Sequence, residues 1–335
     1  MMNYASIKSI ASYVPKYCVD NNYFSDFLET DDEWITKRTG IKTRYFASSE
    51  EKSSDLGLKA SLKALERAGL KAEELDLIIC ATLSPDYVSM PSTACVIAEK
   101  LGLKNTPAFD VSAACTGFIY ALSMARAYVQ GGIYKNILVI GAEKISSVLD
   151  FTDRSTCVLF GDGAGASVVS QSQKPGILDV HINSDGSYAN SLKTPRIGSK
   201  TTNKLLDDIL PAYEDKKQAL HMNGSEIYRL AVRNITNSAK EILSANNLSA
   251  KDLSYFVPHQ ANLRIIHSVA NALDLDYSKL ILTVQKYGNT SAASIPMAIN
   301  DAYEEGKLDK KGQLILLDAF GGGLTWGSAL FYTDF

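Results

Sequence analysis

Val111-Ser112-Ala113-Ala114-Cys115-Thr116-Gly117-Phe118 places a cysteine among small residues, where a short apolar run gives way to a helical pattern. The first N–H groups of a helix have no partners inside the helix, and the helix dipole favours negative charge there. We therefore predict that the Cys115 thiol ionises readily and attacks carbonyl carbon as a thiolate. Two later segments, 258–262 and 288–291, supply polar partners for such a nucleophile. The sequence thus predicts acyl transfer through a cysteine thioester.

A buried structural role is the alternative for any single cysteine, because unpaired cysteine is among the most buried residue types. Taken alone, Cys115 fits that role at least as well as catalysis. Its context separates it from the other cysteines, which lie in or beside apolar runs and are predicted to fill the core: Cys18, Cys80, Cys95 and Cys157.

The composition is that of an ordinary globular protein. The chain has 335 residues, of which 46% are hydrophobic and 21% charged, and its net charge is −3. This length suits two domains or two fused repeats. Nucleic-acid binding is not expected, because it needs a concentrated basic face. The five cysteines form no CxxC pair, so we expect neither a disulfide framework nor a metal site.

Targeting signals are also absent from the sequence pattern. The first eight residues lack the apolar core of a signal peptide, and no apolar run is long enough to span a bilayer. We expect a cytoplasmic protein without a membrane association, in a compartment that keeps thiols reduced.

Short apolar runs alternate with amphipathic stretches along the whole chain, which predicts an α/β fold with a substantially buried sheet. The predicted strands are 77–81, 137–140, 166–169, 255–257 and 314–317. The predicted helices are 54–68, 92–102, 117–130, 224–246, 262–273 and 294–305.

A weak internal repeat relates the two ends of the chain. Segments 65–77, 127–131 and 137–142 match segments 243–255, 302–306 and 314–319, in the same order and with an offset of about 175 residues. Shared order and offset favour duplication over chance similarity. We predict an N-terminal half at 1–170, a connecting segment at 171–220 and a C-terminal half at 221–335. The same offset sets Cys115 opposite Thr290, beside Asn289, so a cleft between the halves would gather distant residues.

His259 and Asn289 are the predicted partners of the cysteine. Each has a structural alternative, since histidine is often a satisfied core residue and Asn a favoured helix cap. Together, an imidazole N–H and a carboxamide N–H suit the task of holding a thioester carbonyl while its alpha carbon gains carbanion character. A cysteine hydrolase would instead place the histidine beside the thiol as a base. The residues alone leave that alternative open.

Two glycine-rich stretches differ in their predicted roles. Residues 319–329 could bring a backbone N–H close to the thioester oxygen, because glycine permits close approach. Residues 160–166 do not fit the G-x-G-x-x-G pattern of a phosphate-binding loop and are interpreted as a structural turn.

The chain resembles the beta-ketoacyl-acyl carrier protein synthase III family of thiolase-fold condensing enzymes. The matching segments are 30–41, 113–118, 257–264, 288–294 and 320–323. The resemblance implies two pseudo-symmetric α/β halves in a layered αβαβα arrangement. It also implies that Cys115 takes an acyl group from acyl-coenzyme A, and that His259 and Asn289 hold the enolate left when malonyl-acyl carrier protein loses carbon dioxide. The N–H groups of Cys115 and Gly323 would form the oxyanion hole, and no cofactor is implied.

Neighbouring families are distinguished in part. Elongating condensing enzymes pair the cysteine with two histidines, whereas this chain has Asn289 at the second position. Degradative thiolases need a second cysteine near the C-terminus, and no cysteine follows Cys157 in this chain. Chalcone-synthase-like enzymes share the cysteine, histidine and asparagine. A condensing enzyme of secondary metabolism, a thioester hydrolase and an inactive acyl-coenzyme A-binding protein therefore remain the alternatives.

A coenzyme A site is predicted around Trp34 and Arg38. Residues 30–33 form a capping-box sequence and Gly40 can end the helix, so the two side chains lie one turn apart on one face. An indole can stack on adenine and a guanidinium can bind phosphate. The structural alternative is a core tryptophan beside a solvated arginine. The resemblance adds Arg154 at the nucleotide and Asn262 along the pantetheine channel.

Carrier-protein docking is predicted on the helix 224–246, where Arg229 and Arg233 project within a narrow arc. Such a stripe is usually only a solvated face, but carrier protein is strongly acidic, and the resemblance adds Arg264. The resemblance also implies a homodimer and an acyl pocket that includes Phe320 and, at a position often filled by an aromatic residue of the partner subunit, Met90.

Overall fold

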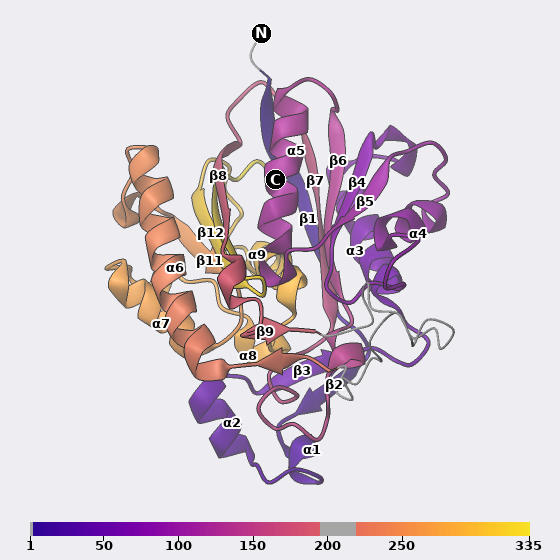
Figure 1. The fold of residues 1–335 in the computed structure, drawn as a ribbon. Coiled ribbons are helices and arrows are strands. Elements are labelled where there is room, and N and C mark those ends of the chain that lie inside the picture. Colours follow the sequence, from indigo (N-terminus) through magenta and orange to yellow (C-terminus); the bar gives the residue numbers. More distant parts are fainter. Residues whose placement is uncertain (1–2, 195–218) are drawn as a thin grey trace, which may run out of the picture.

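The computed structural model describes residues 3–194 and 219–335, and two open β-sheets form its framework (Figure 1). The strand order is β1-β7-β6-β4-β5 in the first sheet and β11-β12-β13-β8 in the second. The first sheet comprises β1 (Tyr4–Tyr13), β4 (Leu77–Ala81), β5 (Ala108–Val111), β6 (Asn136–Glu143) and β7 (Gly163–Ser172). The second comprises β8 (Ile177–Ser184), β11 (Tyr255–Pro258), β12 (Leu314–Gly321) and β13 (Thr325–Tyr332).

Nine α-helices in the described residues accompany these sheets, with two small two-stranded sheets. The helices are α1 (Asn22–Ser25), α2 (Asp32–Thr39), α3 (Ser53–Ala68), α4 (Thr93–Lys100), α5 (Gly117–Gln130), α6 (Gly224–Ala245), α7 (Leu263–Ala272), α8 (Val284–Tyr287) and α9 (Ser294–Glu304). The small sheets pair β2 (Tyr17–Asp20) with β3 (Thr43–Phe46), and β9 (Leu192–Lys193) with β10 (His221–Met222). The predicted α/β class is confirmed, and the predicted helices and strands are present with small shifts of their ends.

The elements stack in five layers, as the αβαβα prediction requires. Helix α3 contacts β1, β6 and β7 of the first sheet, and α4 contacts β4 and β5. Helix α5 contacts strands of both sheets, and α9 beside it contacts β1, β7 and β11. On the outside of the second sheet, α6 contacts β8, β12 and β13, and α7 packs on α6. Figure 1 shows α5 and α9 between the two sheets.

Burial of the first sheet between helices explains the sequence pattern of its central strands. All five residues of β4 are buried, because parallel neighbours flank the strand and helices cover both faces of the sheet. A strand in that position is expected to be continuously apolar. The largest apolar cluster joins residues of both sheets with α5 and α9, so the two halves share one core.

The two sheets repeat the same topology. In the first, β1, β7 and β6 run antiparallel in turn, and β6 and β4 are parallel. In the second, β8, β13 and β12 run antiparallel in turn, and β12 and β11 are parallel. A short 3-10 helix precedes each central helix, η2 (Ala114–Thr116) before α5 and η8 (Ser291–Ala293) before α9. Both short helices begin with a residue at positive φ, Ala114 at 44° and Ser291 at 49°.

This repeat corrects the predicted equivalence of Cys115 and Thr290. Since η2 and η8 occupy equivalent places, the structural counterpart of Cys115 is Ala292. Strand β8 lies within the predicted connecting segment 171–220 and takes the place in the second sheet that β1 takes in the first. Residues 195–218 of that segment lie outside the described residues. The division at residues 170 and 220 stays a prediction.

Three local predictions need correction. The predicted turn at 160–166 is half strand, because β7 begins at Gly163. Helix α2 is capped by Asp31, whose side chain accepts from the Trp34 N–H, and not by Thr30. Among the cysteines predicted to be buried, Cys80 and Cys157 are, whereas Cys18 and Cys95 are exposed because they lie on a small surface sheet and an outer helix. No helix in the described residues is long and apolar enough to cross a membrane.

Candidate active site

Cys115 lies where the edge strand β5 leads through η2 into the central helix α5. Only 6% of the residue is exposed, and this exposed part lines the cavity described below. The short helix η2 contacts both η8 and β12, so the cysteine sits where the two halves of the chain meet. The predicted position at the start of a central helix is confirmed.

The thiol is nevertheless not pre-ionised. Burial, together with a smaller contribution from the nearby Glu143 carboxylate, raises the pKa of Cys115 to about 12. The Ser291 hydroxyl acts in the opposite direction and lowers the pKa. The expectation of a readily ionised thiol is therefore wrong for this state of the protein, because loss of solvent outweighs the favourable helix end. The cysteine needs a proton acceptor when it reacts.

The β12–β13 hairpin is hydrogen-bonded to the segment that carries Cys115. The Thr325 hydroxyl donates to the Ala113 carbonyl at 3.0 Å, and the Thr116 hydroxyl donates to the Thr325 carbonyl at 3.1 Å. Gly321, at the end of β12, approaches so closely that a Cβ there would lie 2.7 Å from the Cys115 backbone nitrogen. Because glycine has no Cβ, the end of β12 can lie directly against the Cys115 backbone.

We expect Gly321→Ala to displace the Cys115 backbone. Overpacking of this kind lowers the free energy of unfolding by about 1–3 kcal/mol, measurable by urea denaturation. A displaced backbone N–H would also slow the chemistry at Cys115. Gly186→Ala is the matched control, because a Cβ at Gly186 would meet nothing within 4 Å. Equal stability of the two variants would contradict this account of Gly321.

His259 follows β11, and its backbone N–H donates to the Asp318 carbonyl of the neighbouring strand at 2.7 Å. The residue is 5% exposed, and its Nδ1 lies 2.6 Å from the hydroxyl oxygen of Ser294, the first residue of α9. Burial lowers the pKa of His259 to about 3, so the imidazole is neutral at ordinary pH.

The hydrogen bonds around Ser294 decide which imidazole nitrogen carries the proton. The Ser294 oxygen also receives the Gln260 backbone N–H at 3.4 Å, and that group can only donate. Within the described residues, the Ser294 hydroxyl proton has no acceptor other than His259 Nδ1. Nδ1 is then the acceptor, and Nε2 carries the hydrogen. His259 therefore presents an N–H donor to the cavity and not a base.

Asn289 is fixed by its own backbone and by the following turn. Its N–H donates to the Leu159 carbonyl at 2.9 Å, and its carbonyl accepts the Gly161 N–H at 3.1 Å. The side-chain oxygen accepts the Ser291 N–H at 2.9 Å. Because the oxygen is engaged, the amide NH2 group is the part of the side chain that can donate to a ligand.

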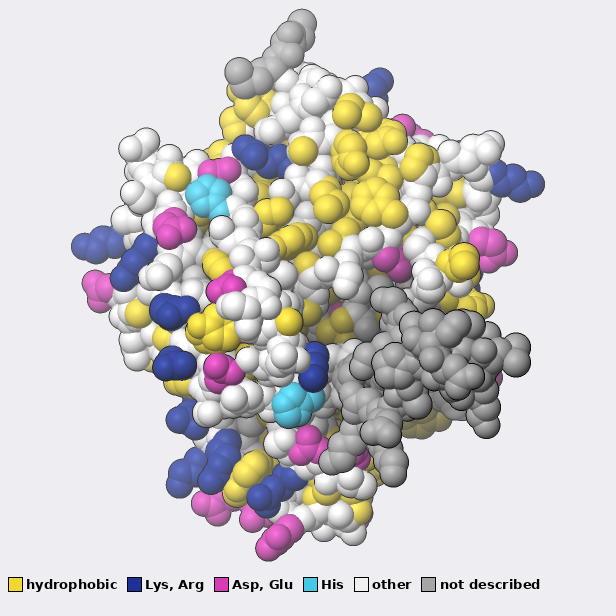
Figure 2. Space-filling view, viewed as in Figure 1, with side chains coloured by type: hydrophobic (Ala, Val, Ile, Leu, Met, Phe, Trp, Pro, Cys, Tyr) yellow, Lys and Arg dark blue, Asp and Glu magenta, His cyan; other side chains and the backbone are white. Residues whose placement is uncertain are grey.

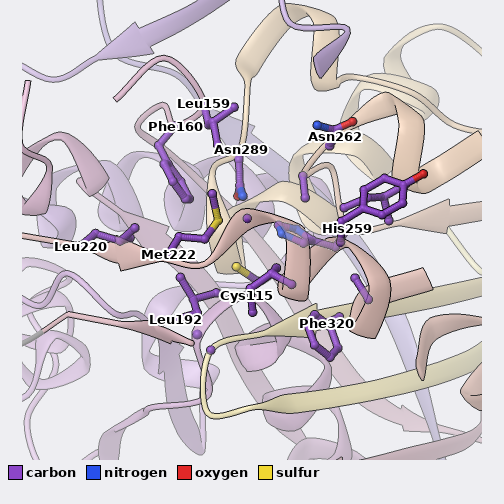
Figure 3. A pocket seen from close by; sticks show the side chains of 18 of the residues that line it. Cys115, Leu159, Phe160, Leu192, Leu220, Met222, His259, Asn262, Asn289 and Phe320 are labelled. Atoms are coloured by element: carbon purple, nitrogen blue, oxygen red, sulfur yellow. The ribbon is translucent and has the colours of Figure 1, made fainter. Parts of the chain in front are cut away.

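The three side chains meet in one cavity of about 560 Å³. Figure 3 shows the Cys115 sulfur with the His259 ring and the Asn289 amide above it, all turned toward the same space. The three residues come from η2, the end of β11 and the turn before η8. Apolar side chains form much of the remaining wall, including Leu159, Phe160, Leu192, Leu220, Met222 and Phe320. The site thus offers a thiol, two neutral donors and a pocket with largely apolar walls.

At the entrance, Trp34, Arg38 and Arg154 also line the cavity. The Arg38 guanidinium lies 4.4 Å from the centre of the Trp34 ring, and the Arg154 guanidinium lies 4.9 Å from it. The predicted common face of Trp34 and Arg38 is thus present. Asn262 lines the cavity too, but its side chain caps α7 by accepting from the Arg264 N–H and donates to the Arg38 carbonyl.

Of the two residues predicted for the acyl pocket, only Phe320 lines the cavity of this chain. Met90 is 80% exposed, with the peptide bond to Pro91 in the cis form, and it does not line the cavity. Gly322 and Gly323 do line it, beside Cys115. Within the described residues, no group of three or more His, Cys, Asp or Glu side chains could hold a metal ion.

Sequence reasoning missed the supporting residues of the site. From the sequence, Ser294 was given no role, and Ser291 none beyond its place in the polar segment 288–291. Glu143, at the end of β6, was not singled out at all. A hydroxyl among alanines at the start of a buried helix, and an acidic residue ending a buried strand, are the signals that could have identified them.

Comparisons with known proteins agree over nearly the whole chain. Residues 109–186 match the family 3-oxoacyl-[acyl-carrier-protein] synthase III, and residues 243–333 match the C-terminal part of that family. Beta-ketoacyl-[acyl-carrier-protein] synthase III of Helicobacter pylori is 56% identical over 98% of both chains, and that of Aliarcobacter butzleri is 54% identical with the same coverage. The structure of the Aquifex aeolicus enzyme superposes with a TM-score of 0.90 at 43% identity, covering 98% of this chain and 100% of that one. A priming beta-ketosynthase of the R1128 polyketide pathway gives a TM-score of 0.91 at 34% identity, covering 99% and 97%.

Proposed function

The chain belongs to the beta-ketoacyl-acyl carrier protein synthase III family, and from that premise we propose that it condenses a short acyl-coenzyme A with malonyl-acyl carrier protein. It is a condensing acyltransferase that initiates fatty acid synthesis, with a thiolase fold. Acetyl-coenzyme A is our first choice of primer. The observation that carries the proposal is the meeting of the Cys115 thiol, His259 and Asn289 in one cavity.

In the first half-reaction, the Cys115 sulfur attacks the acyl carbon of acyl-coenzyme A. The new C–S bond forms, the bond to the coenzyme A sulfur breaks, and an acyl-cysteine results. The backbone N–H groups of Cys115 and Gly323 would donate to the oxygen that becomes negative in the tetrahedral intermediate. Their place on the cavity wall supports this assignment.

In the second half-reaction, the malonyl group loses carbon dioxide and its electron pair forms an enolate. His259 Nε2–H and the Asn289 NH2 group would donate to the enolate oxygen. The enolate carbon then attacks the acyl-cysteine, the C–S bond to Cys115 breaks, and a 3-oxoacyl-acyl carrier protein leaves. The chemistry needs no electron acceptor, and we propose that the enzyme acts without a cofactor.

The position of the hydrogen on the neutral His259 ring argues against the hydrolase alternative. A hydrolase histidine takes the proton of the thiol and then activates water. Nε2 already carries a hydrogen because Ser294 donates to Nδ1, and burial keeps the pKa of the ring at about 3. The secondary-metabolism alternative has weaker support, since the R1128 ketosynthase is 34% identical and the curated synthases III are 56% identical.

We assign the coenzyme A nucleotide to the cavity entrance. Two guanidiniums beside one indole supply charge for phosphates and an aromatic face for adenine. The assignment covers Trp34, Arg38 and Arg154. Asn262 would line the pantetheine channel, mainly through its backbone and Cβ, since its polar atoms already have partners.

We further propose a homodimer in which Met90 reaches the acyl pocket of the partner subunit. Strand β5 is an unpaired edge of the first sheet, and an unpaired edge strand is a ready site for another chain. Figure 2 shows hydrophobic side chains gathered over α5 and its neighbours, where Tyr120, Met124 and Tyr128 recur every four residues and are half-buried. The exposure of Met90 in a single chain also fits a role at a partner's site.

The carrier protein would dock beside the entrance on α6 and α7. Arg229, Arg233 and Arg264 are exposed, whereas the opposite side of α6 is buried. The Arg264 guanidinium lies 5.6 Å from the ring of Tyr228, which itself lines the cavity. Dark-blue side chains follow this side of the molecule in Figure 2.

We expect the triple charge reversal of Arg229, Arg233 and Arg264 to glutamate to raise the KM for malonyl-acyl carrier protein by about tenfold or more at low salt. Acylation by acetyl-coenzyme A should keep its rate, and added salt should reduce the difference between variant and wild type. Lys310→Glu, an exposed reversal just before β12, is the control. An unchanged KM at low salt would exclude this docking surface.

One experiment tests the proposed function as a whole. The protein is incubated with acetyl-coenzyme A, Cys115 is examined for an acetyl group by peptide mass spectrometry, and malonyl-acyl carrier protein is then added. A 3-oxobutanoyl product supports condensation. Acetate as the sole product would indicate a hydrolase, and binding without an adduct would indicate an acyl-coenzyme A-binding protein.

A cytoplasmic location is also proposed. It is supported by the five cysteines, all of which are free, since reduced thiols are the rule in that compartment.

A further inference from the structure

A buried carboxylate lies near the nucleophile, and no cation of the described residues pairs with it. Glu143 ends β6, and none of the residue is exposed. Its oxygens accept from the Thr82 and Ser84 hydroxyls at 3.1 and 2.6 Å and from the backbone N–H groups of Leu83 and Ser84. Within the described residues it forms no ion pair with lysine, arginine or histidine.

A buried carboxylate of this kind is costly to the fold. Removal from water disfavours the ionised form, and burial raises the pKa of Glu143 to about 7. The group can therefore hold or release a proton near neutral pH. Structure alone does not require such a group at the end of β6, whereas a reaction that must move a proton does.

Ser291 belongs to a short helix that contacts the elements carrying both this carboxylate and the thiol. Its short helix η8 packs against both β6 and η2, the elements that carry Glu143 and Cys115. The residue is fully buried, and its hydroxyl oxygen has no hydrogen-bond partner of good geometry in the described residues. The hydroxyl is close enough to both groups to lower the pKa of Cys115 and that of Glu143.

The other candidate acceptor is already occupied. His259 Nε2 carries a hydrogen because Ser294 donates to Nδ1, so it cannot take the thiol proton. The inference rests on the proposed function, in which Cys115 must lose its proton to form the acyl-cysteine.

We propose that Ser291 relays the Cys115 proton to Glu143 during acylation. The S–H proton passes to the Ser291 oxygen while the Ser291 proton passes to the Glu143 carboxylate, and the sulfur forms its bond to the acyl carbon. The coenzyme A thiolate takes a proton from solvent, and Glu143 keeps its proton until condensation breaks the acyl C–S bond and releases the Cys115 thiolate. The proton then returns through Ser291 to that sulfur, which restores the thiol and the Glu143 carboxylate for the next cycle.

Several titratable groups surround the relay. The buried Cys80 on β4, whose pKa is raised well above its usual value, feels Glu143 together with the carboxylates of Asp86 and Asp110. Lys144 follows Glu143, but its amine donates to the carbonyls of Ser48 and Glu51. His259 shares the cavity and is neutral. The Glu143→Gln variant described below identifies the part of any change in Cys115 reactivity that depends on Glu143.

Two serine variants test the relay in the full-length protein. Ser291→Ala should slow the acetylation of Cys115 by acetyl-coenzyme A on the order of 100-fold. It should also slow alkylation of Cys115 by iodoacetamide near neutral pH, a readout that needs no acyl substrate. Ser167→Ala removes another buried, unpartnered hydroxyl and should match the wild type in both reactions.

Glu143→Gln separates a relay from a simple charge effect. The Glu143 charge raises the pKa of Cys115, so removing a mere charge would make alkylation and acetylation faster. A relay predicts that acetylation becomes slower, on the order of 100-fold. Faster acetylation in Glu143→Gln, or wild-type rates in Ser291→Ala, would overturn the proposal. A wild-type protein that is never acetylated would instead overturn the proposed function.

Discussion

Cys115→Ala is expected to abolish acetylation of the protein and to reduce condensation by at least about 10⁴-fold, the scale seen when a nucleophile is removed. The physical reason is covalent, because alanine has no atom that can hold the acyl group between the two half-reactions. Acetylation is measured by the mass of the labelled peptide, and condensation by the 3-oxobutanoyl product.

The structure supplies a matched control for this variant. Cys157 is fully buried, and it lies outside the cavity wall in a separate apolar cluster. Cys157→Ala should keep acetylation and condensation near wild-type rates while losing some stability through the small space it leaves. An acetyl group found on Cys115→Ala protein at another cysteine, with condensation retained, would remove Cys115 from the mechanism.

Much of the framework could be predicted because the sequence encodes it locally. The continuous apolar run of β4 and the amphipathic pattern of α6 each reflect burial that the chain must satisfy. The repeat was visible for the same reason, since equivalent strands and helices in the two halves need similar residues. The exact register of the repeat was not visible, and the predicted counterpart of Cys115 in the second half was misplaced by two residues.

The protonation states at the site could not be predicted in the same way. The sequence shows that Cys115 starts a helix, which alone favours a thiolate. It does not show that η8 and β12 close over that helix end and exclude water, and this exclusion raises the pKa of the thiol. Burial where distant segments meet is a tertiary property. The sequence alone therefore predicted the wrong direction for the pKa shift of Cys115.

Residues that act through other residues were also invisible. Ser294 lies 35 positions from His259 in sequence but 2.6 Å from its Nδ1 in space. The Asn289 side chain depends on the Ser291 N–H of the following turn. Motif reasoning identified the groups that face the cavity and missed those that orient them, because only packing of the two halves brings them together.

His259→Ala and Asn289→Ala are expected to block the second half-reaction and to spare the first. Each variant removes one donor to the enolate oxygen, and loss of such a donor costs about 10²–10³-fold in rate. Acetylation of Cys115 should continue, because neither side chain takes the thiol proton. The measurement is carbon dioxide release from malonyl-acyl carrier protein by the acetylated variants.

The pH dependence sharpens this second prediction. Burial lowers the pKa of His259 to about 3, so the wild-type decarboxylation rate should show no step from imidazole protonation between roughly pH 5 and pH 8. If His259 were a base, the rate would instead fall as the ring gained its proton within that range. His259→Gln is a useful companion variant, since its side-chain NH2 can replace one donor but cannot act as a base. Decarboxylation that is partly restored in His259→Gln relative to His259→Ala would support the donor role, and normal decarboxylation in both alanine variants would refute the roles of His259 and Asn289.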